Sequence, residues 1–263
     1  MFRRTFASKS KLRVMHSCGG AVKKVSIEVM TCALGKITHV IFDVDGLLID
    51  SETIYTDVTT KLLQSYGRQF TMDMKNYLMG MRKCDAVKWL LNTVGLADRI
   101  SVEEYSENYD RLLLKELPNS KLMPGALRLV QHLCKHNVPI ALCTGSNSFE
   151  FNAKMKNHQE LLDMFPVRVL IGDDLSIKRS KPAPDAFFAT MDRFPQKPDA
   201  SANVLVFEDS INGVQAALAA GMNVVMVPNL SYTQPPEDCR NKIMLILNSL
   251  EDFKPESVGL PAF

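Results

Sequence analysis

The body of the chain alternates short apolar runs with longer segments in which apolar residues recur every three or four positions. Short runs rich in Val, Ile and Leu are typical of strands buried on both faces, whereas the longer periodic segments are typical of helices. From residue 37 onward the sequence therefore predicts a parallel sheet flanked by helices. The predicted strands are 38–42, 138–143, 167–171, 204–207 and 224–227.

Helices are predicted between these strands, at 126–137, 184–194 and 211–221. In the first, apolar residues fall on one helix face. The third ends at Gly221, and glycine is a common helix terminator. Strands alternating with helices in this way predict the α/β class, with a doubly wound parallel sheet and a Rossmann-like core.

Residues 52–122 break the alternation, because they contain no convincing strand. They contain helical patterns near 52–66, 85–94 and 102–117, and Ser101 with Glu104 forms a capping box before the last of these. An insertion of this length is too long for a loop. We therefore predict an all-helical cap at 52–122, inserted into a core domain made of 37–51 and 123–263.

Composition and charge narrow the choice of compartment and partner. The chain has 263 residues, 46% of them hydrophobic, which is enough for a sizeable core. Residues 1–36 contain eight Lys or Arg and one acidic residue; because the whole chain carries +2, the remainder carries −5. Such a body gives no reason to expect nucleic acid as a partner, and no segment is apolar enough to span a bilayer. We expect a monomer.

The basic extension 1–36 has the composition of a mitochondrial targeting peptide. A disordered extension from an upstream start codon is the alternative. The six cysteines contain no C-x-x-C pair, which favours a reducing compartment, and the five histidines show no metal-ligand spacing. We expect a cytoplasmic protein, or a mitochondrial one if the extension is a transit peptide.

The residues that follow the predicted strands carry the candidate chemistry. Asp43 and Asp45 follow the first strand, and the group Thr144, Gly145 and Ser146 follows the second. Glu208 and Asp209 follow the strand 204–207, and Lys181 lies in the long loop after the strand 167–171. Asp and Gly also close strands for purely structural reasons. In a doubly wound sheet, however, ligands bind beyond the carboxyl ends of the strands, so we expect these side chains to converge at one edge.

In this order, the motifs FDVDG, CTGS, the lysine of KPAPD and FEDS resemble those of the haloacid dehalogenase superfamily of phosphotransferases. The resemblance runs from about residue 37 to the C-terminus. Within the superfamily the chain is similar to the phosphoglucomutase-like branch, which carries a helical cap after the first motif. The stretches VLIGDD and AALAAGMNVVMVPN look like phosphatases of pseudouridine 5′-phosphate.

The resemblance implies a Mg²⁺-dependent phosphomonoesterase acting on a small phosphorylated metabolite. Asp43 would be the nucleophile that forms an aspartyl phosphate, and Asp45 the general acid and base. Phosphate would be bound by Thr144, Gly145 and Lys181. The ligands of Mg²⁺ would be Asp43, the backbone carbonyl of Asp45, Asp209 and Glu208.

Three further residues leave alternatives open. Arg82 lies where relatives carry a substrate-contacting cap loop, although a solvated helix end explains it equally well. Asp173 and Asp174 form a second acidic pair, for which capping or loop ordering is the favoured interpretation.

The function also has alternatives. Other sugar-phosphate phosphatases, of glycerol-phosphate or hexose-phosphate type, and phosphomutases share the same motifs. A non-catalytic interaction protein with this fold is a further alternative.

Overall fold

A computed structural model describes residues 36–78 and 83–263 of the chain. These described residues form one compact unit. Apart from Lys36, the predicted extension 1–36 lies outside the described residues, as does Arg82. The targeting role of the extension, and with it the compartment, stays a prediction. In the part of the chain that is described, no helix has both the length and the apolar character needed to cross a membrane.

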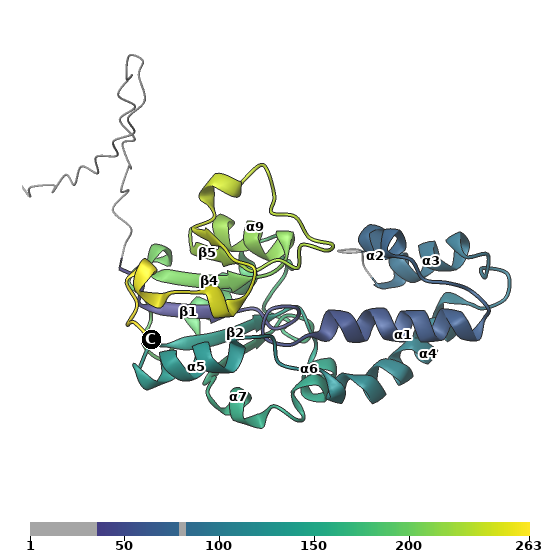
Figure 1. The fold of residues 1–263 in the computed structure, drawn as a ribbon, viewed down its shortest axis with the longest axis horizontal. Coiled ribbons are helices and arrows are strands. Elements are labelled where there is room, and N and C mark those ends of the chain that lie inside the picture. The colour runs from purple at the N-terminus through teal and green to yellow at the C-terminus, as the bar shows by residue number, and fades with distance from the viewer. Residues whose placement is uncertain (1–35, 79–82) are drawn as a thin grey trace, which may run out of the picture. The chain divides into compact units, whose positions relative to one another are not determined.

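A six-stranded parallel sheet forms the centre of the fold (Figure 1). Its strand order is β3-β2-β1-β4-β5-β6, so β1 lies between β2 and β4. The five predicted strands are confirmed, and a two-residue strand at the edge is new. The bounds are β1 His39–Phe42, β2 Ile140–Thr144, β3 Val167–Leu170, β4 Val204–Glu208, β5 Asn223–Met226 and β6 Leu245–Ile246.

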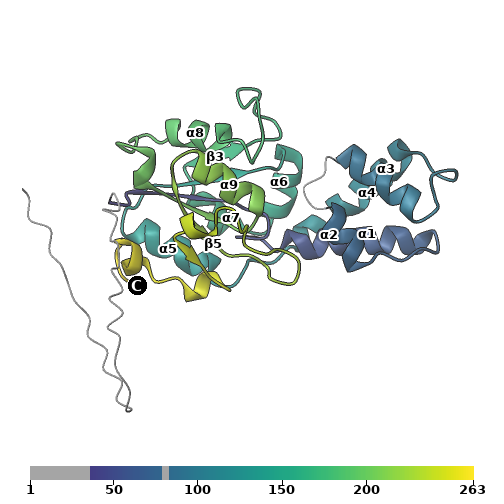
Figure 2. The same cartoon turned by 90° about the horizontal axis from the view of Figure 1, so that it is seen from above.

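Helices cover both faces of this sheet, as a doubly wound fold requires (Figure 2). One face packs against α5, α6 and α7, and the other against α8 and α9. Because successive strand residues point to opposite faces, Phe42 joins the first layer and Ile41 the second. The bounds are α5 Ala126–Lys135, α6 Ser148–Met155, α7 Gln159–Asp163, α8 Asp185–Asp192 and α9 Ile211–Ala219.

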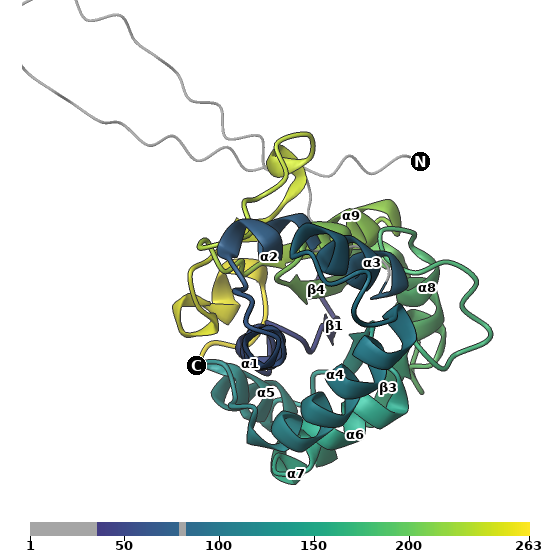
Figure 3. The ribbon, with the colours of Figure 1, turned by 90° about the vertical axis from the view of Figure 1, so that its right-hand side faces the viewer.

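Between β1 and β2, the described chain contains α-helices and no strand of the sheet. The three helices predicted there are observed, together with α2, and Figure 3 shows them. Ser101 accepts a hydrogen bond from the backbone N–H of Glu104, as the capping box predicts. Buried residues such as Leu63, Leu90 and Tyr105 form a separate hydrophobic cluster here. The bounds are α1 Ser51–Ser65, α2 Met72–Leu78, α3 Lys83–Thr93 and α4 Val102–Glu116.

Short 3₁₀ helices complete the described secondary structure. They lie at Leu117–Asn119, Ser201–Asn203, Arg240–Lys242, Leu250–Asp252 and Pro255–Val258.

Candidate functional site

The candidate site lies at the carboxyl ends of β1, β2 and β4, which are neighbours in the sheet. Asp43 follows β1 directly, Thr144 is the last residue of β2, and Glu208 is the last residue of β4. Parallel strands end at the same edge, so the sheet brings together three segments that are far apart in the sequence. The backbone N–H of Asp43 also donates to the carbonyl of Phe207 at 3.1 Å, which fixes the first loop against β4.

Lys181 forms ion pairs with two of the acidic residues. Its Nζ atom lies 2.7 Å from Oδ1 of Asp43 and 2.7 Å from Oε1 of Glu208. It also donates to the carbonyl oxygen of Cys143, at 2.9 Å. The Lys181 and Asp43 side chains are only 10% and 9% exposed. The loop after β3 therefore delivers a fixed positive charge to the first predicted aspartate.

The environment of this pair shifts both pKa values. Burial raises the pKa of Asp43 to about 7, against the opposing effect of the Lys181 charge. Burial alone would lower the pKa of Lys181, but Asp43 and Glu208 raise it well above its ordinary value. Lys181 thus stays a cation, while Asp43 is costly to ionise until further positive charge is present.

Asp43, Glu208 and Asp209 form an acidic cluster that fits a divalent cation. One carboxylate oxygen from each residue lies within 4.8 Å of the others. Burial, together with the charges of Asp43 and Glu208, raises the pKa of Asp209 well above its ordinary value. An all-oxygen set of buried carboxylates suits Mg²⁺, and the ion would relieve the repulsion among them.

Two glycines make room for the acidic cluster. A Cβ atom on Gly213 would lie 1.9 Å from Cδ of Glu208, and one on Gly46 would lie 2.3 Å from Oδ2 of Asp209. Gly46 also has a φ angle of +76°, in the left-handed region that favours glycine. The backbone therefore approaches these carboxylates more closely than any other residue type would allow.

Asp45 is held by a separate set of donors. Oδ1 accepts from Ser51 at 2.6 Å and pairs with the ammonium group of Lys154. Oδ2 accepts from Thr144 at 3.0 Å and from Ser146 at 2.9 Å. Both carboxylate oxygens therefore have two donors each.

These donors determine the protonation state of Asp45. Burial acts to raise its pKa, but the Lys154 charge and the hydrogen bonds outweigh burial and lower the pKa to about 2. Asp45 is therefore a carboxylate in this arrangement. That is the form in which a carboxyl group accepts a proton.

Two of the four donors, Ser51 and Lys154, were not singled out from the sequence, whereas Thr144 and Ser146 were. Ser51 begins α1, Ser146 follows β2, and Lys154 lies in α6, which the hydrophobic pattern did not predict. Ser146 belongs to the CTGS motif, so the sequence contained a signal for it. For Lys154 there was none, because a lysine in a mixed polar segment normally lies on the surface.

The other residues predicted from the sequence lie partly in the site and partly outside it. Thr144 reaches the site, where its hydroxyl donates to Asp45. Gly145 is exposed next to it. Asp173 accepts from the backbone N–H of Ser148 at the start of α6. Asp174 pairs with Arg193 at 2.5 Å, so both aspartates order loops, as their favoured interpretation predicts.

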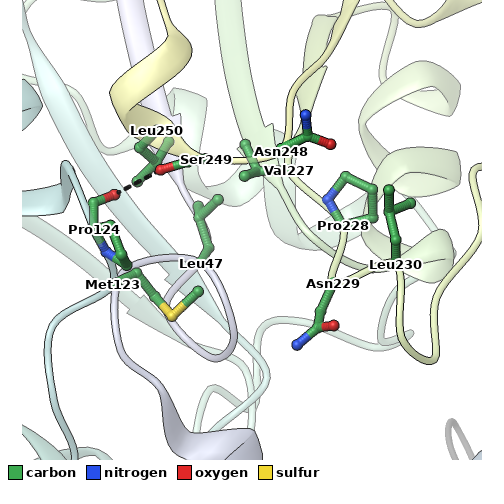
Figure 4. A pocket seen from close by; sticks show the side chains of 10 residues that line it. All are labelled: Leu47, Met123, Pro124, Val227, Pro228, Asn229, Leu230, Asn248, Ser249 and Leu250. Carbon is green, nitrogen blue, oxygen red and sulfur yellow. Dashed lines mark hydrogen bonds between the residues drawn. The ribbon is translucent and has the colours of Figure 1, made fainter.

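A cavity of ≈ 370 Å³ lies beside the loop that follows β1 (Figure 4). It is lined by apolar and neutral polar side chains, among them Leu47, Met123 and Leu250. None of the charged residues described above lines it, and its described lining contains no acidic or basic side chain.

Comparison with known proteins gives the family. Residues 37–221 match the family model of the haloacid dehalogenase-like hydrolases. A (DL)-glycerol-3-phosphatase 2 from Arabidopsis thaliana is 42% identical over 89% of this chain and 96% of its own length. A probable pseudouridine-5′-phosphatase from Drosophila melanogaster is 40% identical, covering 88% of this chain and 97% of its own.

A solved structure supports the fold independently. The putative β-phosphoglucomutase from Thermotoga maritima superposes with a TM-score of 0.67, covering 80% of this chain and 94% of that one, at 24% identity. The resemblance of the motifs is thereby confirmed, as is the α/β fold. The chain belongs to the haloacid dehalogenase-like hydrolases, and within them it is a phosphatase.

Proposed function

We propose that this phosphatase hydrolyses a small phosphomonoester through an aspartyl phosphate on Asp43, with pseudouridine 5′-phosphate as its substrate. The observation that carries the mechanism is the position of Asp43. Its carboxylate, at the edge of the sheet, pairs with the Lys181 ammonium group and forms the acidic cluster together with Glu208 and Asp209. The Lys181 charge, and a cation held by the acidic cluster, would offset the repulsion when this carboxylate approaches a negatively charged phosphate.

In the first step, a carboxylate oxygen of Asp43 forms a bond to phosphorus and the ester P–O bond breaks. The departing alkoxide oxygen takes a proton from Asp45. Asp45 is a carboxylate in the free protein. The proton must therefore arrive with the substrate, and a phosphomonoester bound as its monoanion carries one.

In the second step, water attacks the phosphorus atom of the aspartyl phosphate and Asp45 takes up the proton that water loses. Inorganic phosphate leaves and Asp43 is restored. The four donors around Asp45 favour this base form. Lys181 stabilises negative charge on the transferring group throughout.

The acidic cluster would hold Mg²⁺ through Asp43, Glu208 and Asp209, with the backbone carbonyl of Asp45 as a further ligand. When bound, the ion would offset the repulsion between the Asp43 carboxylate and the phosphate. Lys181 pairs with Oε1 of Glu208 at 2.7 Å and so restrains this side chain. Ser210 donates to the other oxygen of Glu208, at 3.0 Å.

The pseudouridine assignment is supported by the Drosophila relative, and the Arabidopsis relative supports glycerol 3-phosphate as the second candidate. The test is a phosphate-release assay of the full-length protein with Mg²⁺, comparing pseudouridine 5′-phosphate, uridine 5′-phosphate and glycerol 3-phosphate. We expect the highest kcat/KM with pseudouridine 5′-phosphate. A higher kcat/KM with glycerol 3-phosphate would identify glycerol 3-phosphate as the substrate instead, without contradicting the proposed mechanism.

A phosphomutase would use the same core residues but return the phosphoryl group to a sugar. Incubation with glucose 1-phosphate separates the two activities, because a mutase yields an isomeric sugar phosphate without free phosphate. We expect no isomerised product. Isomerisation without phosphate release would contradict the proposed hydrolysis.

A further inference from the structure

Lys154 is a fully buried lysine whose charge is directed at the candidate site. Its side chain is 0% exposed, and its ammonium group pairs with Oδ1 of Asp45. It also donates to Oγ of Ser146 at 2.8 Å and to the hydroxyl of Tyr55 at 3.3 Å. Among the described residues, Asp45 is the one carboxylate with which it forms an ion pair. A buried ammonium group is costly unless it is paired, so this position depends on Asp45.

The contacts of Lys154 constrain the direction of the Asp45 carboxylate. Lys154 binds Oδ1 directly and binds Ser146, which in turn donates to Oδ2 at 2.9 Å. The three groups form a closed set of contacts that spans both oxygens. Without the ammonium group, Oδ1 would keep only Ser51, and rotation of the carboxylate would be less restricted.

We infer that Lys154 is a positioning residue for the reaction: it orients the Asp45 carboxylate for proton transfer to the leaving oxygen and from water. The inference rests on the proposed function, in which Asp45 is the general acid and base. It assigns to α6 a part in the chemistry that the four sequence motifs do not contain.

A purely structural role is the competing explanation, because Tyr55 lies in α1 and Lys154 therefore also links α6 to α1. Leaving groups distinguish the two roles. An alkyl phosphate needs a proton donor for its leaving oxygen, whereas p-nitrophenolate leaves with little help. Loss of positioning should therefore slow the first displacement only with the alkyl substrate, while a general structural defect should slow both.

The test measures the first turnover of the full-length protein with Mg²⁺ by rapid quench, using p-nitrophenyl phosphate and pseudouridine 5′-phosphate. If the wild type turns over glycerol 3-phosphate faster than pseudouridine 5′-phosphate, glycerol 3-phosphate is the alkyl probe. For Lys154→Met we expect the first-turnover rate to fall about 10- to 100-fold with the alkyl substrate and less than about threefold with p-nitrophenyl phosphate. Tyr55→Phe removes the link to α1 and keeps the ion pair, so the ratio of the two rates should stay at the wild-type value.

Ser146→Ala is a smaller change that removes the hydroxyl between Lys154 and Oδ2, and it should shift the ratio in the same direction as Lys154→Met. It provides the test if Lys154→Met does not fold. Equal losses with both substrates in either variant would overturn the inference, as would a shifted ratio in Tyr55→Phe. A wild-type protein that hydrolyses no phosphomonoester would instead refute the proposed function itself.

Discussion

Lys181 Nζ lies 2.7 Å from Oδ1 of Asp43, although 138 residues separate them in the sequence. The loop after β3 brings the lysine across the end of β2, where the carbonyl of Cys143 accepts its second hydrogen bond. A single cation thus contacts both the proposed nucleophile and Glu208 of the acidic cluster. Replacing Asp43 should therefore remove catalysis without leaving Lys181 unpaired.

For Asp43→Asn we expect a turnover rate below about one hundredth of the wild-type rate, because an amide cannot form the acyl phosphate. The free energy of unfolding should change by only about 1 kcal/mol, since Glu208 still neutralises Lys181 and the buried carboxylate is costly to ionise. Steady-state assays and urea unfolding measure the two quantities. A residual rate above that limit would argue against Asp43 as the nucleophile.

If the acidic cluster holds Mg²⁺, as proposed, the stability of the protein should depend on this ion. Binding to the folded state alone stabilises it, so the melting temperature of the wild-type protein should rise as Mg²⁺ is added and fall again with EDTA. Asp209→Asn removes one of the three carboxylates and should weaken this rise substantially. Calorimetric titration gives the affinities directly.

Asp192→Asn is the matched control for the metal experiment, because this exposed aspartate pairs with Lys197 and not with the acidic cluster. It should respond to Mg²⁺ as the wild type does. A melting temperature that does not change with Mg²⁺ in the wild type would mean that the cluster is not a cation site.

The hydrophobic pattern predicted most of the sheet, but the strand at its edge was not predicted. Strands β1 to β5 were predictable because each is short and rich in Val, Ile, Leu or Phe, as is typical of strands in a parallel sheet. Strand β6, Leu245–Ile246, has only two residues and exists through its pairing with β5. It lies within the apolar run 243–247, so the sequence contained a signal for a strand there that the prediction did not use.

The candidate site, too, was predictable from the sequence only in part. Asp43, Lys181 and Glu208 were predictable because each belongs to a motif at or after the end of a strand. Lys154 was not, because its burial results from the packing of α6 against the rest of the site. Composition and spacing describe neighbours along the chain, whereas a buried ion pair over 109 residues depends on the tertiary fold.

Gly213→Ala tests how tightly the backbone surrounds Glu208. Alanine ordinarily stabilises a helix by about 1 kcal/mol relative to glycine. Here its Cβ would lie 1.9 Å from Cδ of Glu208, and overpacking costs about 1–3 kcal/mol. We expect net destabilisation and weaker Mg²⁺ binding, measured by urea unfolding and calorimetry.

Gly145→Ala serves as the folding control for this glycine prediction, because a Cβ at position 145 would meet nothing within 4 Å. Its free energy of unfolding should be close to that of the wild type. Stabilisation of the protein by Gly213→Ala would show that Glu208 can move away without cost.

The two proposed duties of Asp45 can be separated by the choice of substrate. With an alkyl phosphate, Asp45→Asn should block the first displacement, since the alkoxide leaves poorly without a proton donor. With p-nitrophenyl phosphate that step should survive, while the second step lacks a base to activate water. The variant should therefore release up to one equivalent of p-nitrophenolate per enzyme and then slow sharply. Mass spectrometry should detect the phosphoryl group on Asp43, and linear release without phosphorylated protein would show that Asp45 is not the base.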